Sequence, residues 1–309
     1  MAACALSHGE TELLSGTELT QFRAEVCPAA APYPAAPRNT ERVAAGARCG
    51  GAPVGLAVSE IVRAGSAPVA RLRSLAVSET HRNSGVGATL LRAIETELRA
   101  RSCSDVSVVV IGNSRPRTLE RRIAGAGWPV LELRGLLCET TVDMLRQARW
   151  LSYGKLPPGS QVFPWTALTP GEREDLEQRR SVESWHPKLD PFASEDRIDP
   201  ETSLGLRMGN RVEGWCLFHR IAPGRTACAA LYVGESLQGR GYGVALAARA
   251  IRRHGSRLEH RIVFDVAFDN ALMMSFLRRG LMPHLTSARL IRSSTKCFGG
   301  RTPAIEVRA

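Results

Sequence analysis

Short apolar segments divide the first half of the chain into a series of strands and helices. We expect a helix at Glu18–Val26, followed by a Pro/Ala-rich loop at Cys27–Pro37. Further along, the spacing of apolar positions predicts strands at Arg42–Cys49, Pro53–Val62, Val69–Val77 and Asp105–Ile111, and helices from Gly87 to about Arg101 and at Thr118–Ala126.

The second half repeats this order of elements. The pattern predicts helices near Pro170–Arg180, from Val244 to about Arg253 and at Asn270–Arg279, and strands at Ser203–Arg207, Val212–Ile221, Thr226–Val233 and Arg261–Phe268. A Gly/Pro-rich segment, Tyr153–Gly159, separates the halves. We therefore predict a duplicated chain with one domain at 1–152 and a second at 160–309.

A glycine-rich turn stands between a strand and a helix in each half. The second half has Gln238-Gly-Arg-Gly-Tyr-Gly243 after the strand that ends at Val233, and the first has Arg82-Asn-Ser-Gly-Val-Gly87 after Val77. Backbone N–H groups at such a turn, together with the dipole of the following helix, favour phosphate groups. Two turns at the same place in each half predict a duplicated phosphate-binding fold.

Composition limits the classes of protein that the chain fits. It has no run of 18 apolar residues and no basic segment ahead of an apolar one at its start, so we expect no membrane span, no secretory signal and a cytoplasmic location. The eight cysteines are scattered without Cys-x-x-Cys spacing or paired histidines, which favours reduced thiols and no metal site.

Positive charge is concentrated in the last third of the chain. The net charge is +11, and the residues from Leu237 onward carry +9 of it. This field indicates either an anionic ligand or polyanion near that surface, or an ordinary solvated basic face. Four arginines after the second glycine turn are the candidates for contact with a phosphate or a nucleic-acid backbone: Arg252, Arg253, Arg257 and Arg261.

At the two glycine turns the chain resembles the GNAT superfamily of acyl-CoA-dependent acyltransferases. The family signature, Gln/Arg-x-x-Gly-x-Gly/Ala about five residues after a strand valine, matches Gln238 after Val233 and Arg82 after Val77. The plan of the whole chain resembles that of tandem GNAT enzymes, and the likeness is more specific in the second half. It implies an α/β fold of the α+β type, in which each domain is a mixed, mostly antiparallel sheet flanked by helices.

The resemblance also implies a ligand and a mechanism. The turns would hold the pyrophosphate of acyl-CoA, a co-substrate rather than a tightly bound cofactor, and the strand before each turn would diverge from its neighbour to admit the pantetheine arm. An amine would then attack the thioester directly. The implied cofactor-binding positions are Val77, Arg82, Asn83, Ser84, Gly85, Val86 and Gly87, and Leu231, Val233, Gln238, Gly239, Arg240, Gly241, Tyr242 and Gly243.

One position departs from the family pattern. Many GNAT enzymes have a tyrosine in the last helix that acts as acid for the leaving thiolate, whereas this chain has Ile123 and Phe276 at the matching places. Neither side chain donates a proton. The departure leaves the donor open, because a donor whose leaving group is not a thiol would not need that acid.

The second half offers the catalytic and substrate candidates, and we expect it to be the active half. His219 at a strand end is the candidate base, and Tyr232 on the strand before the turn is the candidate acid or positioning group. Trp185 and His186, in the segment that begins at Glu183 and has no counterpart in the first half, are candidates for a substrate loop. Each also has a purely structural interpretation as a packed aromatic or a hydrogen-bonded histidine.

These observations lead to one main function and two alternatives. The main prediction is an N-acyltransferase that moves an acyl group, acetyl by default, from acyl-CoA to a small-molecule amine in specialised metabolism. The first alternative uses an aminoacyl-tRNA or an acyl carrier protein as donor, bound through the basic last third. The second is a non-catalytic protein of the same fold that binds CoA or RNA.

Overall fold

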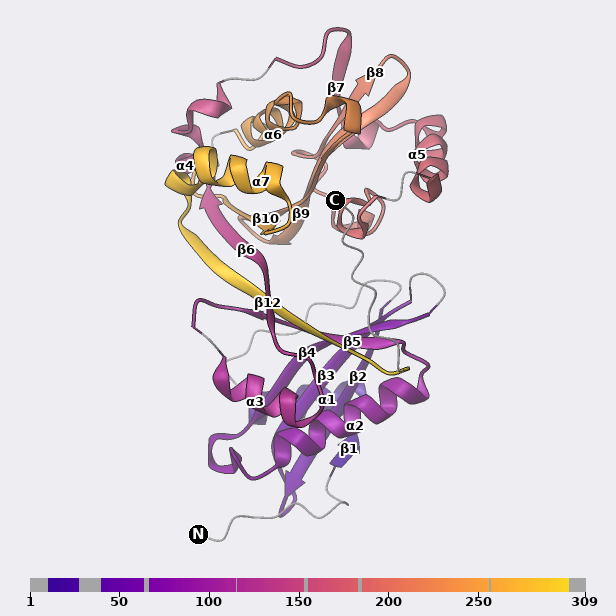
Figure 1. Ribbon diagram of the computed structural model, residues 1–309, viewed down its shortest axis with the longest axis vertical. Helices are drawn as coiled ribbons and strands as arrows, with labels where there is room; N and C mark the ends of the chain where they lie inside the picture. The colour runs from indigo at the N-terminus through magenta and orange to yellow at the C-terminus, as the bar shows by residue number, and fades with distance from the viewer. Residues whose placement is uncertain are drawn as a thin grey trace. The chain divides into compact units, whose positions relative to one another are not determined.

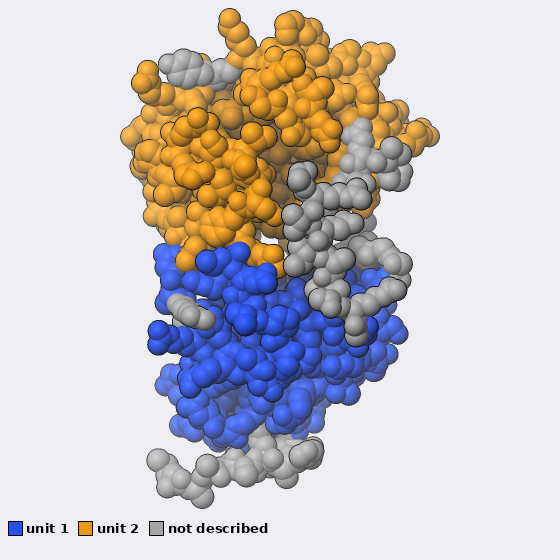
Figure 2. Space-filling model, in the orientation of Figure 1, with its two compact units in different colours: residues 1–133, 291–309 blue, residues 134–290 orange. Residues whose placement is uncertain are grey.

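The computed structural model describes residues 11–27, 40–63, 67–114, 116–152, 155–182, 185–255 and 257–299. The chain forms two compact units: unit 1 comprises residues 1–133 and 291–309, and unit 2 comprises residues 134–290 (Figures 1 and 2). Within the described ranges, no helix is both long and apolar enough to cross a membrane.

Unit 1 is a mixed sheet with one parallel pair of strands. Its strand order is β1-β2-β3-β4-β5-β12, and only β4 and β5 run parallel. The strands are β1 (Thr11–Leu13), β2 (Thr40–Cys49), β3 (Ala52–Val62), β4 (Val69–Val77), β5 (Asp105–Ile111) and β12 (Ser287–Cys297). The helices are α1 (Gly16–Val26), α2 (Val86–Ala100) and α3 (Arg117–Gly125).

Unit 2 has the same kind of sheet. Its strand order is β6-β11-β10-β9-β8-β7, and only β10 and β11 run parallel. The strands are β6 (Glu132–Thr141), β7 (Ser160–Pro164), β8 (Leu204–Met208), β9 (Arg211–Ala222), β10 (Arg225–Val233) and β11 (Arg261–Ala267), and the helices are α4 (Val142–Arg146), α5 (Pro170–Val182), α6 (Tyr242–Arg252) and α7 (Ala271–Phe276). The predicted mixed, mostly antiparallel sheets flanked by helices are confirmed.

The compact units differ from the predicted domains 1–152 and 160–309 at two places. Residues 134–152 belong to unit 2, and residues 291–309 belong to unit 1. Strand β12 accounts for the second difference, because Ile291–Cys297 pair with β5. Strands β1, β6, β7 and β12 were not predicted, and a strand pattern alone does not indicate which sheet a strand joins. Most of the predicted loop Cys27–Pro37 and residue Glu183 lie outside the described residues.

Two apolar clusters lie on the sheet of unit 2. The first packs α6 and the segment after α7 against β8, β9 and β11, with Leu246, Ile262 and Leu277 as members. The second includes Trp165, Leu176 of α5 and Trp215. Alternation along a strand sends successive side chains to opposite faces, and β10 follows this rule: Leu231 packs on the first cluster and Tyr232 on the second.

A buried carboxylate fixes the end of β12 to unit 1. The side chain of Glu95 in α2 is 5% exposed; it accepts hydrogen bonds from Trp128 Nε1 at 2.7 Å and from Lys296 Nζ at 2.7 Å. Lys296 also donates to the carbonyl oxygen of Ala126. Because a buried charge that loses its partner is costly, this network holds the last strand against α2 and the turn after α3.

We expect Lys296→Met to destabilise unit 1 by roughly 2–4 kcal/mol, because it leaves the Glu95 carboxylate buried with fewer partners. Hydrogen exchange of α2 amides in increasing urea measures the effect. Arg99→Ala is the matched control: Arg99 also pairs with Glu95, but its side chain is 47% exposed, so its loss costs about 1 kcal/mol or less. Equal effects of the two variants would contradict this role of Lys296.

Unit 2 also has a buried titratable group, the imidazole of His254. His254 is 1% exposed, and neither ring nitrogen has a hydrogen-bond partner within the described part of the chain. Its ring meets Phe218 edge-on with centroids 5.3 Å apart, and the His260 ring lies 4.7 Å away. Burial, and next the charge of His260, lower the pKa of His254 to about 4. The ring is therefore neutral in the folded protein at neutral pH.

The stability of unit 2 is expected to fall as the pH drops from about 6.5 to about 4. In that window the unfolded chain binds a proton at His254 that the folded chain excludes, which removes up to about 3 kcal/mol. Urea unfolding at a series of pH values, compared between the protein and His254→Phe, measures the difference. The aromatic variant should lose most of this dependence; a variant with an unchanged pH profile would show that other groups cause it.

Candidate functional site

The second glycine turn forms an open N-terminus for α6. A 3-10 turn at Glu235–Leu237 follows β10, and Gly239 and Gly241 then take left-handed φ values of 71° and 81°. Side chains other than glycine are strained in this region. Gln238 Nε2 donates to the carbonyl oxygen of Val233 at 3.1 Å, which explains the five-residue spacing in the sequence. The first N–H groups of the 11-residue helix lack partners within the helix and can bind an anion.

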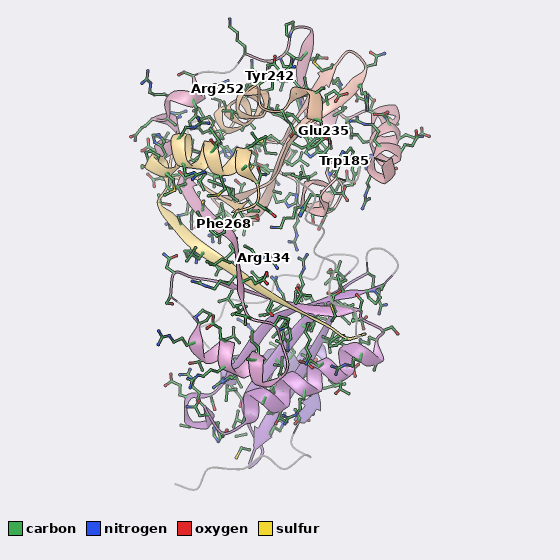
Figure 3. All side chains as sticks on the ribbon, viewed as in Figure 1. Arg134, Trp185, Glu235, Tyr242, Arg252 and Phe268 are labelled. Carbon is green, nitrogen blue, oxygen red and sulfur yellow. The ribbon has the colours of Figure 1, made fainter. Side chains whose placement is uncertain are left out.

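A cavity of about 860 Å³ begins at this turn. Its wall includes seven of the eight positions predicted in the second half, namely Leu231, Val233, Gln238, Gly239, Gly241, Tyr242 and Gly243, whereas Arg240 is not part of it. From the turn the cavity extends past β10 to Asn270 and Phe276. Figure 3 marks Tyr242 and Arg252, the first and last residues of α6.

The strands beside this cavity diverge. β10 and β11 pair only from Arg225 to Ala227, opposite Arg261 to Val263, and β10 then continues to Val233 paired with β9 alone. A bulge at Ala229 interrupts its pairing with β9. This confirms the divergence that the resemblance implied. A second cavity, of about 450 Å³, occupies the gap between Cys228–Leu231 and Phe264–Ala267.

Tyr232 lies at the first cavity within a group of aromatic rings. Its ring centroid is 4.4 Å from that of Trp215 and 5.9 Å from that of Trp185. Trp185 meets Trp215 edge-on at 5.0 Å, and Trp215 Nε1 donates to the carbonyl oxygen of Leu189 at 2.9 Å. The structure therefore brings the two predicted aromatic residues Tyr232 and Trp185 together.

His186 and its neighbours lie at the second cavity. His186 is exposed there, and its Nδ1 accepts a hydrogen bond from the backbone N–H of Lys188 at 3.2 Å. Lys188 Nζ lies 2.5 Å from Asp265 Oδ2 on β11. This pair attaches the segment after Trp185 to the strand across the gap, so the predicted substrate segment lies at the mouth of the cavity.

His219 does not line either cavity. It pairs with Ala227 on β10 and forms an isolated bridge with Ile198. Burial, and next the charge of Arg197, lower the pKa of His219, which favours the neutral ring. The structure brings Tyr232 to the site but leaves His219 outside its wall.

The four arginines of the predicted polyanion site bond to the protein itself. Arg252 donates to the carbonyl oxygen of Leu151, Arg253 Nε to that of Glu201 at 2.5 Å, and the Arg257 guanidinium pairs with the Glu201 carboxylate. Arg261 Nη1 lies 3.5 Å from Glu139 Oε1. None of the four lines the two cavities of unit 2.

The first glycine turn has a smaller cavity of about 280 Å³. Val77, Asn83, Gly85 and Gly87 line it together with Arg121 and Arg122 of α3. The other predicted positions have local roles: Arg82 Nη1 lies 3.2 Å from Glu79 Oε1, Ser84 Oγ donates to the His81 carbonyl at 2.6 Å, and Val86 is buried. Gly85, with a φ of 91°, caps α2.

The cavities include residues that sequence reasoning missed. Trp150 lines both cavities of unit 2; its ring meets Phe276 edge-on at 5.1 Å, and its Nε1 donates to the Gly280 carbonyl at 2.9 Å. Asn270, Arg279 and His284 also line the first cavity. Trp150 lies in the segment assigned to the first domain by the sequence, so no local signal placed it here.

The described cysteines are mostly free thiols, as predicted. These are Cys27, Cys103, Cys138, Cys216, Cys228 and Cys297, whereas Cys49 is disulfide-bonded, contrary to the prediction of reduced thiols. Burial raises the pKa of the Cys138 thiol to about 11. A hydrogen bond with Cys228, and next burial, raise the pKa of Cys216. These protonated thiols are poor nucleophiles.

Comparison with known proteins identifies relatives of both halves. A sequence model of the Acetyltransferase (GNAT) family matches residues 15–118 and 165–281. Among solved structures, the chain is similar to a tandem GNAT protein from the clavulanic acid biosynthesis pathway, with a TM-score of 0.62 and 15% identity over 95% of this chain and 100% of that one.

Two further solved structures share the fold. The glucosamine N-acetyltransferase region of a fungal multi-domain β-N-acetylglucosaminidase has a TM-score of 0.62 and 14% identity, over 93% of this chain and 38% of that one. A GCN5-related N-acetyltransferase from Sphaerobacter thermophilus has a TM-score of 0.53 and 18% identity, over 82% and 80%. No curated protein matches the chain.

Proposed function

Because the chain belongs to the GNAT family of acetyltransferases, we propose that unit 2 forms amides by transferring an acyl group from acyl-CoA to a small-molecule amine. The observation that carries this proposal is the continuous wall of the first cavity, which joins the glycine turn to the diverging part of β10. A pyrophosphate at the turn and an extended thiol-bearing arm along β10 fit that path.

Gly243 supports this use of the turn. A Cβ built at Gly243 would lie 3.9 Å from Val233 Cγ2, an ordinary contact, and its φ is not left-handed. The fold therefore tolerates a side chain here, yet the position lines the cavity. A glycine that the protein's own packing does not require suits the close approach of a ligand phosphate to the backbone.

The reaction needs few catalytic side chains. The amine nitrogen attacks the thioester carbonyl carbon, a C–N bond forms, the C–S bond breaks and CoA leaves as a thiolate. The proton lost by the amine passes to water, directly or through the Tyr232 hydroxyl group, and the thiolate takes a proton from solvent, since Phe276 offers none. Backbone N–H groups beside the bulge at Ala229 would stabilise the charge on the carbonyl oxygen. Holding the two reactants together supplies most of the acceleration.

The residues of unit 2 suit the two substrates on different sides of β10. Tyr232 is placed among Trp185 and Trp215, on the face opposite to Leu231, where it would position the amine or exchange a proton with it. The exposed His186 and the Lys188–Asp265 pair stand at the mouth of the gap, on the path by which a polar acceptor would enter.

The donor proposal is tested with Gly243→Ala and its counterpart in unit 1, Gly87→Ala. We expect Gly243→Ala to keep the stability of unit 2 or raise it by up to about 1 kcal/mol, and to weaken acetyl-CoA binding roughly 10–100-fold, because the methyl group displaces the pyrophosphate. Isothermal titration calorimetry and urea unfolding provide the two readouts. If Gly87→Ala alone removed binding, the donor site would belong to unit 1.

Tyr232→Phe is expected to lower kcat roughly 100-fold while leaving the dissociation constant for acetyl-CoA unchanged, because only the hydroxyl group is removed. His219→Gln is the matched comparison, since His219 lies outside the cavity walls and should retain activity. The turnover of each variant is measured with a panel of small amines by detecting the free thiol of the released CoA. The opposite pattern, with His219→Gln inactive and Tyr232→Phe unaffected, would make His219 the essential group.

A further inference from the structure

The second cavity reaches beyond the strands into the apolar interior of unit 2. Its inner wall includes Phe218, Ile251 and Ile262, which are 1%, 7% and 2% exposed. Small side chains create the room: Cys228, Ala229 and Ala230 on β10, and Ala247 on α6. The polar groups of the wall include His186, Lys188 and Asp265. The cavity therefore has a polar part and an apolar interior.

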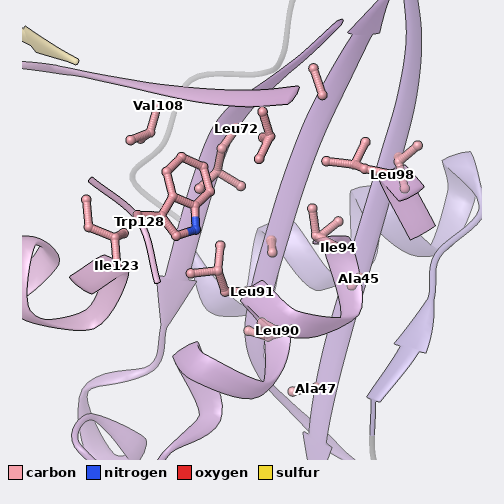
Figure 4. Packing of buried hydrophobic residues seen from close by; sticks show 14 of the residues in the cluster. Ala45, Ala47, Leu72, Leu90, Leu91, Ile94, Leu98, Val108, Ile123 and Trp128 are labelled. Carbon is pink, nitrogen blue, oxygen red and sulfur yellow. The ribbon is translucent and has the colours of Figure 1, made fainter. Parts of the chain in front are cut away.

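In unit 1, larger side chains occupy the positions that correspond to the small residues of this cavity. Counting from the paired valines and glycines of the two halves, Leu72 corresponds to Cys228 and Leu91 to Ala247. Both leucines are buried in the core of unit 1, where they lie with Trp128 (Figure 4). The backbone follows the same course in both units, with a bulge at Arg73 in β4 and at Ala229 in β10. The cavity thus results from the choice of side chains in unit 2.

The two cavities of unit 2 adjoin. Leu231, Met273 and Phe276 line both of them, and so does Trp150. The Phe276 ring is held in place: Trp150 packs edge-on against it, and a Cβ on Gly280 would lie 2.9 Å from its Cε2 atom. Apart from Asn270, the residues that line both cavities are apolar, which suits an apolar chain.

We propose that this second cavity holds the acyl chain of the donor, so that unit 2 prefers acyl-CoA substrates with chains well longer than acetyl. The inference rests on the proposed function. About 450 Å³ far exceeds the space for one methyl group, which is comparable to the roughly 30 Å³ share of a water molecule. Each methylene buried in the cavity should tighten donor binding about fourfold.

Calorimetric titration of the full chain with CoA, acetyl-CoA, butanoyl-CoA and octanoyl-CoA tests the proposal without requiring turnover. We expect affinity to rise with chain length, and octanoyl-CoA to bind at least about 100-fold more tightly than acetyl-CoA. Equal or weaker binding of octanoyl-CoA would overturn the acyl-chain assignment alone and would favour the acceptor amine as occupant. No binding of any of these ligands would instead overturn the donor in the proposed function.

Two cavity-filling variants locate the effect. Ala247→Leu and Cys228→Leu each introduce the residue that unit 1 has at the equivalent position, and both should reduce the preference for octanoyl-CoA over acetyl-CoA at least about tenfold while preserving acetyl-CoA binding. That preserved binding also reports that the variant is folded. Leu272→Ala, which changes the wall of the first cavity only, should leave the chain-length preference unchanged. Unaltered preference in both leucine variants would contradict the assignment.

Discussion

The short parallel pairing of β10 with β11 determines the arrangement of unit 2. Three residues on each strand are paired, and beyond them β10 keeps its ladder to β9 on one side only. Beyond the paired residues, β10 therefore presents unpaired N–H and C=O groups to a gap within the sheet. Such an exposed edge can pair with a strand from another chain. The gap here adjoins cavities, the glycine turn that follows β10 opens into the same space, and Phe276 and Trp150 stand at their junction. A ligand with an extended amide-bearing arm satisfies such an edge as a further strand would.

The duplicated halves keep this backbone but differ in side chains. Both units have the bulge, the divergence and the glycine-capped helix. In unit 1 leucines and Trp128 fill the interior, and the Glu95 network ties that core to β12. In unit 2 alanines and a cysteine leave it hollow. The same fold therefore has a filled interior in unit 1 and a hollow one in unit 2, and the difference lies in a few residues of differing volume.

The sequence predicted the features that depend on local chemistry. The glycine turns, the helices after them and the paired strands follow from φ requirements and apolar periodicity, and these were found within a few residues. Tyr232 lies on the predicted strand and lines the first cavity, and its role as acid or positioning group stays a prediction. His219 lies on β9 opposite Ala227 of β10, but outside both cavity walls. The spacing of residues in the sequence does not show which end of a strand borders a cavity. The four arginines were predicted to contact a polyanion, yet each has a partner distant in the chain, such as Glu201 or Glu139. Such long-range pairings, like the placement of β12, cannot be read from the periodicity of apolar residues in the sequence.

The division of β12 between the two units has a consequence for synthesis of the chain. The strand that pairs with β5 is synthesised about 180 residues after its partner. Until residues 291–297 leave the ribosome, β5 is an unpaired sheet edge and Glu95 lacks the lysine that neutralises it. Domains usually mature in the order of translation. Unit 1 begins to emerge first, but it is completed only when residues 291–297 emerge, so the edge of β5 stays open to pairing with other strands until then.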